Sequence, residues 1–408
     1  MSFESQSEAK ISAVGQWPRR HPVVGPILKR LLAGLHAGHL TIVTPSGERI
    51  DYRAPAHGPE AILVFRTWRA LRRIVFAGDV GFAEAYIAGE WSSPDLTSLI
   101  ALAARNGDYL EHAILGWVPL RALNRLRHLL NANSRSGSRR NISYHYDLGN
   151  DFYRLWLDRS MTYSSALYKE PGQSLEDAQQ NKQQQILDLL ALRGGERVLE
   201  IGCGWGSLAA RLARRGAQVT ALTLSQQQFT HANAAIAAEG WTDRIEFRLQ
   251  DFRDAMGSFD RIVSIEMLEA VGEEYWPIYF RTLRERLRAG GKAVLQVITI
   301  REERFEAYRK GADFIQRYVF PGGLLPSKEV IADQAKSAGL LLTSATSFGE
   351  SYALTLTEWR RRFLNAWPEI EQLGFQPSFR RLWEYYLCYC EAGFRTGYLD
   401  VGLYLVDG

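Results

Sequence analysis

Short apolar runs alternate with stretches of helical period through the second half of the chain. The runs rich in Val, Ile and Leu predict buried strands at 197–201, 218–224, 244–249, 261–265 and 293–300. The stretches between them carry apolar residues three and four positions apart and predict helices at 179–192, 207–214, 226–239 and 275–288. This alternation predicts an α/β fold with a parallel, doubly wound sheet.

The first third of the chain has a different pattern. Ile62–Phe65 is an apolar, strand-like run, and residues 66–76 interleave apolar side chains with arginines. That basic stretch could lie against a membrane or be an ordinary amphipathic surface element. A second basic amphipathic stretch, 120–130, leads into the polar, Gly- and Ser-containing segment 131–142. We therefore predict a tail at 1–20, a smaller domain at 21–130, a linker at 131–142 and a larger domain at 143–408.

Composition adds a charge asymmetry to this division. With 408 residues, 46% of them hydrophobic and 23% charged, the chain is long and apolar enough for two globular domains. Residues 1–140 hold 18 Lys and Arg against 11 Asp and Glu, whereas the remaining residues hold 31 against 34. The basic first third predicts nucleic acid or anionic phospholipid as a partner, although a solvated arginine-rich face would give the same count. Because we find no nucleic-acid-binding motif, no nucleic acid is expected.

The sequence also bears on location and on cysteine chemistry. No apolar run approaches the roughly 20 residues needed to span a bilayer, and the polar N-terminus lacks the pattern of a secretory signal peptide. We expect a cytoplasmic protein. Its cysteines, Cys203, Cys388 and Cys390, are too few for a disulfide framework and lack the second pair of a zinc site, so we expect free thiols and no metal.

The candidate ligand site follows the first predicted strand. Glu200 lies near the end of that strand, and Gly202, Gly204 and Gly206 precede a predicted helix. Glycines there let the backbone turn tightly and approach a ligand closely. A dinucleotide-binding fingerprint would have its third glycine one residue later and an acidic residue after the next strand. The spacing instead resembles motif I of S-adenosylmethionine-dependent methyltransferases, with dinucleotide binding and a structural turn as the alternatives.

A later strand end supports the same cofactor. Asp251 follows the predicted strand 244–249, and its carboxylate could accept a hydrogen bond from an adenine amino group. A helix N-cap or a turn is the alternative role, because Asp favours both. The carboxyl end of a strand suits either role.

Longer motifs identify the chain with a family. They are Tyr144–Tyr153, Met161–Ala166, Gly202–Gly206, Glu269–Gly272, Tyr318–Gly323 and Leu325–Ser327. In this order they resemble the cyclopropane-fatty-acyl-phospholipid synthase family, which includes the mycolic acid cyclopropane synthases, from about residue 40 to the end. The resemblance implies a Rossmann-like class I methyltransferase fold with a smaller N-terminal α+β lipid-binding domain. It also implies C-terminal helices and an acyl-binding insertion at about 300–330.

The resemblance implies methyl transfer from S-adenosylmethionine to a cis double bond of a phospholipid acyl chain, through a carbocation. It assigns Tyr146, Tyr163 and Ser164 to the methionine end of the cofactor, Thr223 and Gln227 to the ribose, Asp251 to the adenine, and Glu200, Gly202, Gly204 and Gly206 to the glycine-rich motif. Plain aromatic packing is the alternative for the two tyrosines. Aromatic faces can stabilise a cation, which suits Phe314, Tyr318 and Phe320.

In the family a bound bicarbonate removes the proton that allows ring closure. Its ligands correspond here to Ser165, Glu269, Gln296, Ile298 through its backbone, and Tyr352. The chain departs from the family pattern where Ser165 replaces Cys, Gln296 replaces His, Ala270 replaces His and Glu266 replaces Gly. Glu266 could remove the proton itself, repel the bicarbonate, or simply be solvated or paired with an arginine.

These departures resemble the branch of the family that makes methyl-branched or methylene acyl chains, including 10-methyl and furan fatty acids. We expect acyl C-methylation, with a cyclopropane or an open chain as the product. The rival interpretations are a methyltransferase for another hydrophobic small molecule and a catalytically silent lipid-binding homologue. The implied partners are an unsaturated phospholipid and the anionic inner face of the membrane, bound peripherally, and a homodimer is left open.

Overall fold

The computed structural model describes residues 24–311, except 108–147, and residues 313–408. Its chain forms two compact units, the first made of Met1–Asn124 with Gly374–Thr396 and the second of Arg125–Leu373 with Gly397–Gly408. The predicted tail, the basic stretch 120–130, the linker 131–142 and Tyr146 lie outside the described residues.

The first unit contains a four-stranded sheet of order β2-β1-β3-β4. Its strands are β1 (Ala37–Val43), β2 (Arg49–Arg53), β3 (Ala56–Phe65) and β4 (Trp91–Ser92), and its helices are α1 (Val24–Ala33), α2 (Arg69–Ile87), α3 (Leu96–Arg105) and α18 (Pro377–Arg395). Strands β1 and β3 are parallel, and the other pairs are antiparallel. The basic stretch 66–76 leads into and forms the first half of α2, which changes direction at Gly78 (φ 59°).

Helix α18 comes from the far end of the chain yet packs within this first unit. Thr97 of α3 donates from Oγ1 to the buried Glu391 of α18 (3.1 Å), and Arg381 donates from Nε to the Ile87 carbonyl (2.7 Å). The sequence placed these residues in a continuous domain 143–408, whereas the structure groups Gly374–Thr396 with the N-terminal residues.

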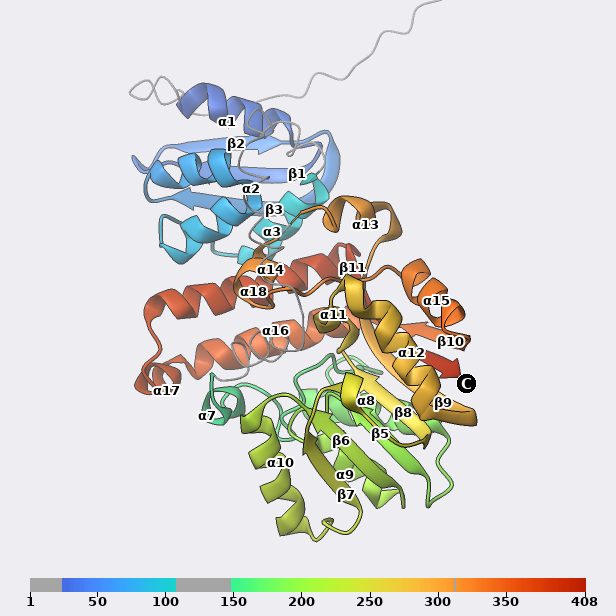
Figure 1. The fold of residues 1–408 in the computed structure, drawn as a ribbon. Helices are drawn as coiled ribbons and strands as arrows, with labels where there is room; N and C mark the ends of the chain where they lie inside the picture. The colour runs from blue at the N-terminus through green and yellow to red at the C-terminus, as the bar shows by residue number, and fades with distance from the viewer. Residues whose placement is uncertain (1–23, 108–147, 312) are drawn as a thin grey trace, which may run out of the picture. The chain divides into compact units, whose positions relative to one another are not determined.

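The second unit is built on a seven-stranded sheet of order β10-β11-β9-β8-β5-β6-β7 (Figure 1). The strands are β5 (Arg197–Ile201), β6 (Gln218–Thr223), β7 (Ile245–Leu249), β8 (Phe259–Ile265), β9 (Leu287–Ile300), β10 (Leu341–Ser347) and β11 (Leu399–Asp407). The neighbouring strands β9, β8, β5, β6 and β7 are parallel, as predicted. The Rossmann-like class I fold is confirmed. Beyond the parallel strands, β11 enters between β9 and β10 and runs antiparallel to both.

Helices follow most strands of the second unit. They are α7 (Asn150–Arg154), α8 (Leu175–Leu190), α9 (Ser207–Arg214), α10 (Gln226–Glu239), α11 (Leu268–Val271), α12 (Trp276–Arg286), α13 (Glu302–Tyr308), α14 (Phe314–Tyr318), α15 (Lys328–Ser337), α16 (Gly349–Asn365) and α17 (Trp367–Gln372), with short 3₁₀ turns η1 (Phe252–Asp254) and η2 (Glu273–Tyr275). Helices α9 and α10 have the predicted bounds. None of the described helices is long and apolar enough to cross a membrane.

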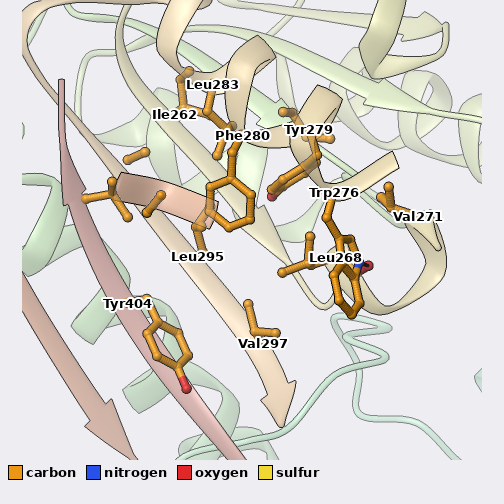
Figure 2. Close-up of a cluster of buried hydrophobic side chains, with 14 of the residues drawn as sticks. Ile262, Leu268, Val271, Trp276, Tyr279, Phe280, Leu283, Leu295, Val297 and Tyr404 are labelled. Carbon is orange, nitrogen blue, oxygen red and sulfur yellow. Dashed lines mark hydrogen bonds between the residues drawn. The ribbon is translucent and has the colours of Figure 1, made fainter. Parts of the chain in front are cut away.

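An apolar core fixes the strands that carry the candidate site. Figure 2 shows Trp276, Tyr279 and Phe280 of α12 packed against Leu295 and Val297 of β9, all buried. Burying such aromatic side chains contributes about 1.5–3 kcal/mol each. The core therefore holds β8 and β9 rigidly side by side at the edge where both strands run toward the site.

Candidate functional site

The candidate site residues gather where three parallel strands end. In the β5–β8 pair Ile201 lies opposite Ser264, and in the β8–β9 pair Ile265 lies opposite Gln296. The segments that continue β5 and β8, beginning at Gly202 and Glu266, therefore leave the sheet at the same edge. This is the edge at which open α/β sheets bind ligands.

The glycine-rich turn after β5 has a backbone that only glycine adopts easily. Gly202, Gly204 and Gly206 have φ values of 82°, 52° and 90°. A Cβ at Gly202 would lie 2.4 Å from Met267 Cγ and one at Gly206 would lie 2.7 Å from the Phe247 ring, but one at Gly204 would meet open space. Two glycines thus permit tight packing, and Gly204 leaves room for a ligand to approach the backbone.

Glu200 lies in the β5 interior beside this turn. Its side chain is buried, and its Oε2 atom has no hydrogen-bond partner in the described part of the chain. Burial raises the pKa of Glu200 to about 8, although the ammonium group of Lys182 lowers it. An unpartnered buried carboxyl oxygen next to an open glycine turn fits a cofactor that carries hydrogen-bond donors.

Thr223, one of the two residues assigned to the ribose, is hydrogen-bonded to Gln228. Thr223 and Gln228 are both buried, and Thr223 Oγ1 donates to Gln228 Oε1 (2.8 Å). Gln227, the predicted ribose contact, is exposed. Ser225 begins α10 as its N-cap, so positions 225 and 228 face inward while 227 faces outward.

Asp251 follows β7 as predicted, and both of its proposed roles are compatible with its contacts. It caps η1 by accepting from the Arg253 backbone N–H (2.9 Å). The Arg253 guanidinium also donates to both of its carboxylate oxygens, at 2.9 and 2.6 Å. Arg253 stacks over the Tyr275 ring at 5.0 Å, so Asp251 is held in one orientation at the sheet edge.

The segment before α8 supplies the predicted methionine-end residues. Tyr163 is half-buried and packs against the rings of Tyr153, Trp156 and Trp359, with centroids 5.2–5.6 Å apart. Its neighbour Ser164 is buried and accepts a hydrogen bond from Lys182 Nζ (2.6 Å). Aromatic packing therefore orients the segment, and the buried ammonium group of Lys182 is hydrogen-bonded to it through Ser164.

A half-buried carboxylate lies at the centre of the predicted catalytic residues. Glu266 directly follows β8, has a positive φ of 52° and accepts three hydrogen bonds. The donors are Ser165 N (2.9 Å), Gln296 Nε2 (2.7 Å) and Tyr352 OH (2.8 Å). A positive φ is strained for glutamate, and such strain is concentrated at functional sites. Neither solvation nor an arginine partner explains this residue.

The electrostatics of Glu266 combine opposing effects. Burial raises its pKa above the usual 4.5, while the Ser165 N–H, the Lys182 ammonium, the Tyr352 hydroxyl and the Gln296 amide lower it. Its donors thus favour the ionised form, against the effect of burial.

Glu269 is the second buried carboxyl group. Its Oε1 accepts from the Ile298 backbone N–H, and its Oε2 has no partner among the described residues. Burial and, secondarily, the charge of Glu266 raise the pKa of Glu269 to about 8. The carboxyl of Glu269 is therefore mainly protonated at neutral pH, whereas the donors around Glu266 favour ionisation of that carboxyl.

The ligand set that the family resemblance assigns to bicarbonate is already used by the chain. Ser165 N, Gln296 Nε2 and Tyr352 OH all donate to Glu266, and Ile298 N donates to Glu269. Ser165 Oγ donates to the Ala166 carbonyl (2.9 Å). With its donors engaged and a carboxylate among them, this arrangement does not fit a bound bicarbonate.

Sequence reasoning missed three polar residues of this site: Lys182, Gln228 and Arg253. Lys182 gave a usable signal, because it is a charged residue on the apolar face of the predicted helix 179–192. Of the aromatic residues predicted near the carbocation, Phe314 is fully buried in α14, and its ring lies 5.6 Å from that of Tyr318.

Comparisons with known proteins agree with this geometry. Residues 133–403 match the family model described as mycolic acid cyclopropane synthetase. Tuberculostearic acid methyltransferase UfaA1 of Mycobacterium tuberculosis is 42% identical over 86% of this chain and 83% of its own. Cyclopropane-fatty-acyl-phospholipid synthase of Escherichia coli K12 is 35% identical over 80% and 82% of the two chains.

Solved structures show the same fold. Mycolic acid cyclopropane synthase CmaA1, complexed with SAH and CTAB, is 31% identical with a TM-score of 0.63. The match covers 66% of this chain and 98% of that one. Coclaurine N-methyltransferase is 19% identical with a TM-score of 0.62 and shares the fold alone.

The fold, the glycine-rich turn and these matches define an S-adenosylmethionine-dependent methyltransferase. More narrowly, the chain belongs to the mycolic acid cyclopropane synthetase family. Its activity is methyl transfer from S-adenosylmethionine to unsaturated fatty-acyl chains, giving cyclopropane or methyl-branched lipids.

Proposed function

We propose that this enzyme methylates the double bond of a phospholipid acyl chain and releases an open, methylene-branched or methyl-branched chain, with Glu266 as the base. The observation that carries the proposal is the Glu266 carboxylate held by Ser165, Gln296 and Tyr352. A relative 42% identical to the chain is named as a tuberculostearic acid methyltransferase, which supports the open-chain product.

The chemistry requires little of the protein beyond positioning and one proton transfer. Bound S-adenosylmethionine supplies an electrophilic methyl group. Addition of that methyl to one alkene carbon leaves a carbocation on its neighbour. Glu266 then accepts a proton from a chain carbon next to the cation, and the C–H electron pair becomes a C=C bond in a methyl-branched chain. A methylene branch forms when a hydride first shifts from the methylated carbon to the cation and Glu266 then takes a proton from the added methyl, whose C–H electron pair becomes the C=C bond. Loss of the proton from the added methyl with bond formation to the cation would instead close a ring.

The setting of Glu266 suits this role. Its three donors hold the carboxylate in one orientation and favour its ionised form. The carboxyl of Glu269 is mainly protonated near neutral pH because burial raises its pKa to about 8. A neutral Glu269 leaves Glu266 as the stronger proton acceptor of the pair.

The product distinguishes the two outcomes. We would express the chain in a bacterium that lacks its own cyclopropane synthase and examine the extracted phospholipids by proton NMR. The proposal predicts vinylic proton signals from a branched chain and no upfield cyclopropane protons. Ring protons would overturn the open-chain product, and unchanged lipids would overturn the lipid substrate.

We also propose that the first unit binds the anionic inner surface of the membrane. Arg66 just before α2 and Arg72 and Phe76 in its first half are exposed, and Phe76 is 46% exposed. Arg69 and Arg73 on the same helix are engaged with the buried Glu90. Part of the positive charge in this region therefore stabilises the fold, and Arg66 and Arg72 are the arginines best placed for phosphate headgroups.

A further inference from the structure

Helix α8 presents a row of buried polar side chains to the segment that contains Ser164 and Ser165. Gln179 donates from Nε2 to the Ser164 carbonyl (2.8 Å), and Lys182, one turn later, donates to Ser164 Oγ (2.6 Å). Lys182 is only 2% exposed. A fully buried lysine is rare unless it is paired with a negative charge.

Lys182 has fewer partners than its chemistry requires. An ammonium group has three N–H donors, yet within the described residues its one hydrogen bond is to Ser164 Oγ. The carboxylates of Glu266, Asp158 and Glu200 act on it electrostatically, but Glu266 is held by other donors. Asp158 likewise accepts from Thr162 N and Ser160 N.

The groups around Lys182 complement a zwitterion. Lys182 offers unused donors to a carboxylate, and Glu200 has an unpartnered oxygen for an ammonium group. Glu200 leads directly into the glycine-rich turn, where Gly204 leaves open space. A free α-amino acid group carries a carboxylate that could accept from Lys182 and an ammonium that could donate to this Glu200 oxygen.

We propose that Lys182, with Ser164, binds the α-carboxylate of the amino-acid part of S-adenosylmethionine. Lys182 then links the two halves of the site, because the adjacent Ser165 N–H holds Glu266 (2.9 Å). A bound carboxylate completes the hydrogen bonding of the buried ammonium, which burial otherwise disfavours by lowering the pKa of Lys182 to about 8. The inference shares with the proposed function only the cofactor, not the lipid product.

The test compares two ligands that differ only in the carboxylate. Calorimetry would measure binding of S-adenosylmethionine and of decarboxylated S-adenosylmethionine to the wild-type protein and to Lys182→Met. We expect the wild type to prefer S-adenosylmethionine by about tenfold or more, because a hydrogen bond to a charged group contributes about 1.5–3 kcal/mol. Lys182→Met should bind both ligands with nearly equal affinity.

Gln179→Met is the matched control, since it removes a hydrogen bond from the same helix face to the same serine. It should keep the wild-type preference between the ligands. An equal loss of both ligands in Lys182→Met would assign Lys182 a structural role and overturn the proposal. A wild type without preference would overturn it as well, even if Lys182→Met failed to fold, and no lipid product is measured.

Discussion

Glu266 illustrates how one residue can change the chemistry of a site. Its φ of 52° belongs to a backbone conformation that favours glycine, the usual residue of the family at this position. The strained conformation places a carboxylate where Ser165, Gln296 and Tyr352 donate to it. A bound anion at that point would meet like charge, which supports our proposal that Glu266 itself is the base.

Replacement of Glu266 by Gln should abolish most of the turnover. The amide keeps the shape but accepts no proton, and a positioned base contributes about 10²–10⁴-fold to a rate. We expect a loss in that range with little change in S-adenosylhomocysteine affinity, measured by methyl incorporation into phospholipid vesicles and by calorimetry. Wild-type turnover should persist in buffer freed of carbon dioxide. A requirement for added bicarbonate, or a loss below about threefold, contradicts the assignment.

The pH dependence of turnover tests the same assignment of Glu266 as the base. The base must be ionised, and burial raises the pKa of Glu266 above its usual 4.5. Wild-type turnover should therefore fall as the pH drops through that raised pKa, and the residual rate of Glu266→Gln should show no such acid limb. Exposed Glu273, which pairs with Arg309, provides the control variant Glu273→Gln, and its profile should match the wild type.

Residue identities near the site could be predicted only where a motif fixed them. The glycines and Glu266 were found because each occupies a defined position in a recognisable pattern. Which of Gln227 and Gln228 points inward depends on the helix phase after Ser225, and a one-residue shift is invisible in a run of glutamines. The contacts of Arg253 with Asp251 depend on rotamers that no local pattern encodes.

At the scale of elements, the turn between β5 and α9 contains one glycine that close packing requires and another that leaves room for a ligand. Gly206 begins α9, and a Cβ there would lie 2.7 Å from Phe247 of β7 and 3.2 Å from Ala232 of α10. Gly204 lies two residues earlier, and a Cβ there would meet no atom within 4 Å. Both glycines have positive φ, so a residue with a Cβ would be strained at either position. The two positions differ in the space available for that Cβ.

Alanine at these two positions should therefore have different effects. Gly206→Ala should lower the stability by several kcal/mol, because strain of about 1–3 kcal/mol adds to a clash with a buried ring. Gly204→Ala should cost only the strain and should weaken S-adenosylhomocysteine binding at least about tenfold by filling the cofactor's approach. Thermal unfolding and calorimetry measure the two effects. Equal changes in both properties for both variants would contradict the distinction.

The sheet shows which elements a local pattern can predict. Strand β5 and helices α9 and α10 have the predicted bounds, because an apolar run, a glycine turn and a helical period define each end. Strand β10 was not predicted, since its sequence LLTSATS is mostly polar and largely exposed. The antiparallel entry of β11 between β9 and β10 is a non-local pairing, which strand patterns alone do not specify.

At the scale of the whole molecule, neither of the two units is one continuous stretch of the sequence. Residues Gly374–Thr396 belong to the unit of the N-terminal residues, and β11 then returns to the second unit. The sequence suggested one boundary at a polar linker, because composition marks linkers but not crossings between units. The chain therefore passes between the units more than once, and the charge of the first unit includes arginines of α18 such as Arg381.

The final prediction concerns how the charge of the first unit acts on the intact protein. Reversing the charge of two exposed arginines, Arg66 just before α2 and Arg72 within it, in Arg66→Glu/Arg72→Glu, should weaken binding to anionic vesicles. Each basic residue near such a surface contributes about 1 kcal/mol, so the pair should lower the affinity at least about tenfold at low salt. Cosedimentation with phosphatidylglycerol vesicles measures the change.

Arg159→Glu/Arg193→Glu is the matched control, because it reverses the same amount of charge at exposed positions of the second unit. If the first unit docks through α2, this control should bind anionic vesicles nearly as well as the wild type at equal net charge. Raising the salt should weaken the wild type toward the level of the α2 variant, since screening acts on exposed charges. Equal wild-type binding to neutral vesicles at high salt would instead assign the attachment to apolar contacts such as Phe76, and would remove the electrostatic role of Arg66 and Arg72.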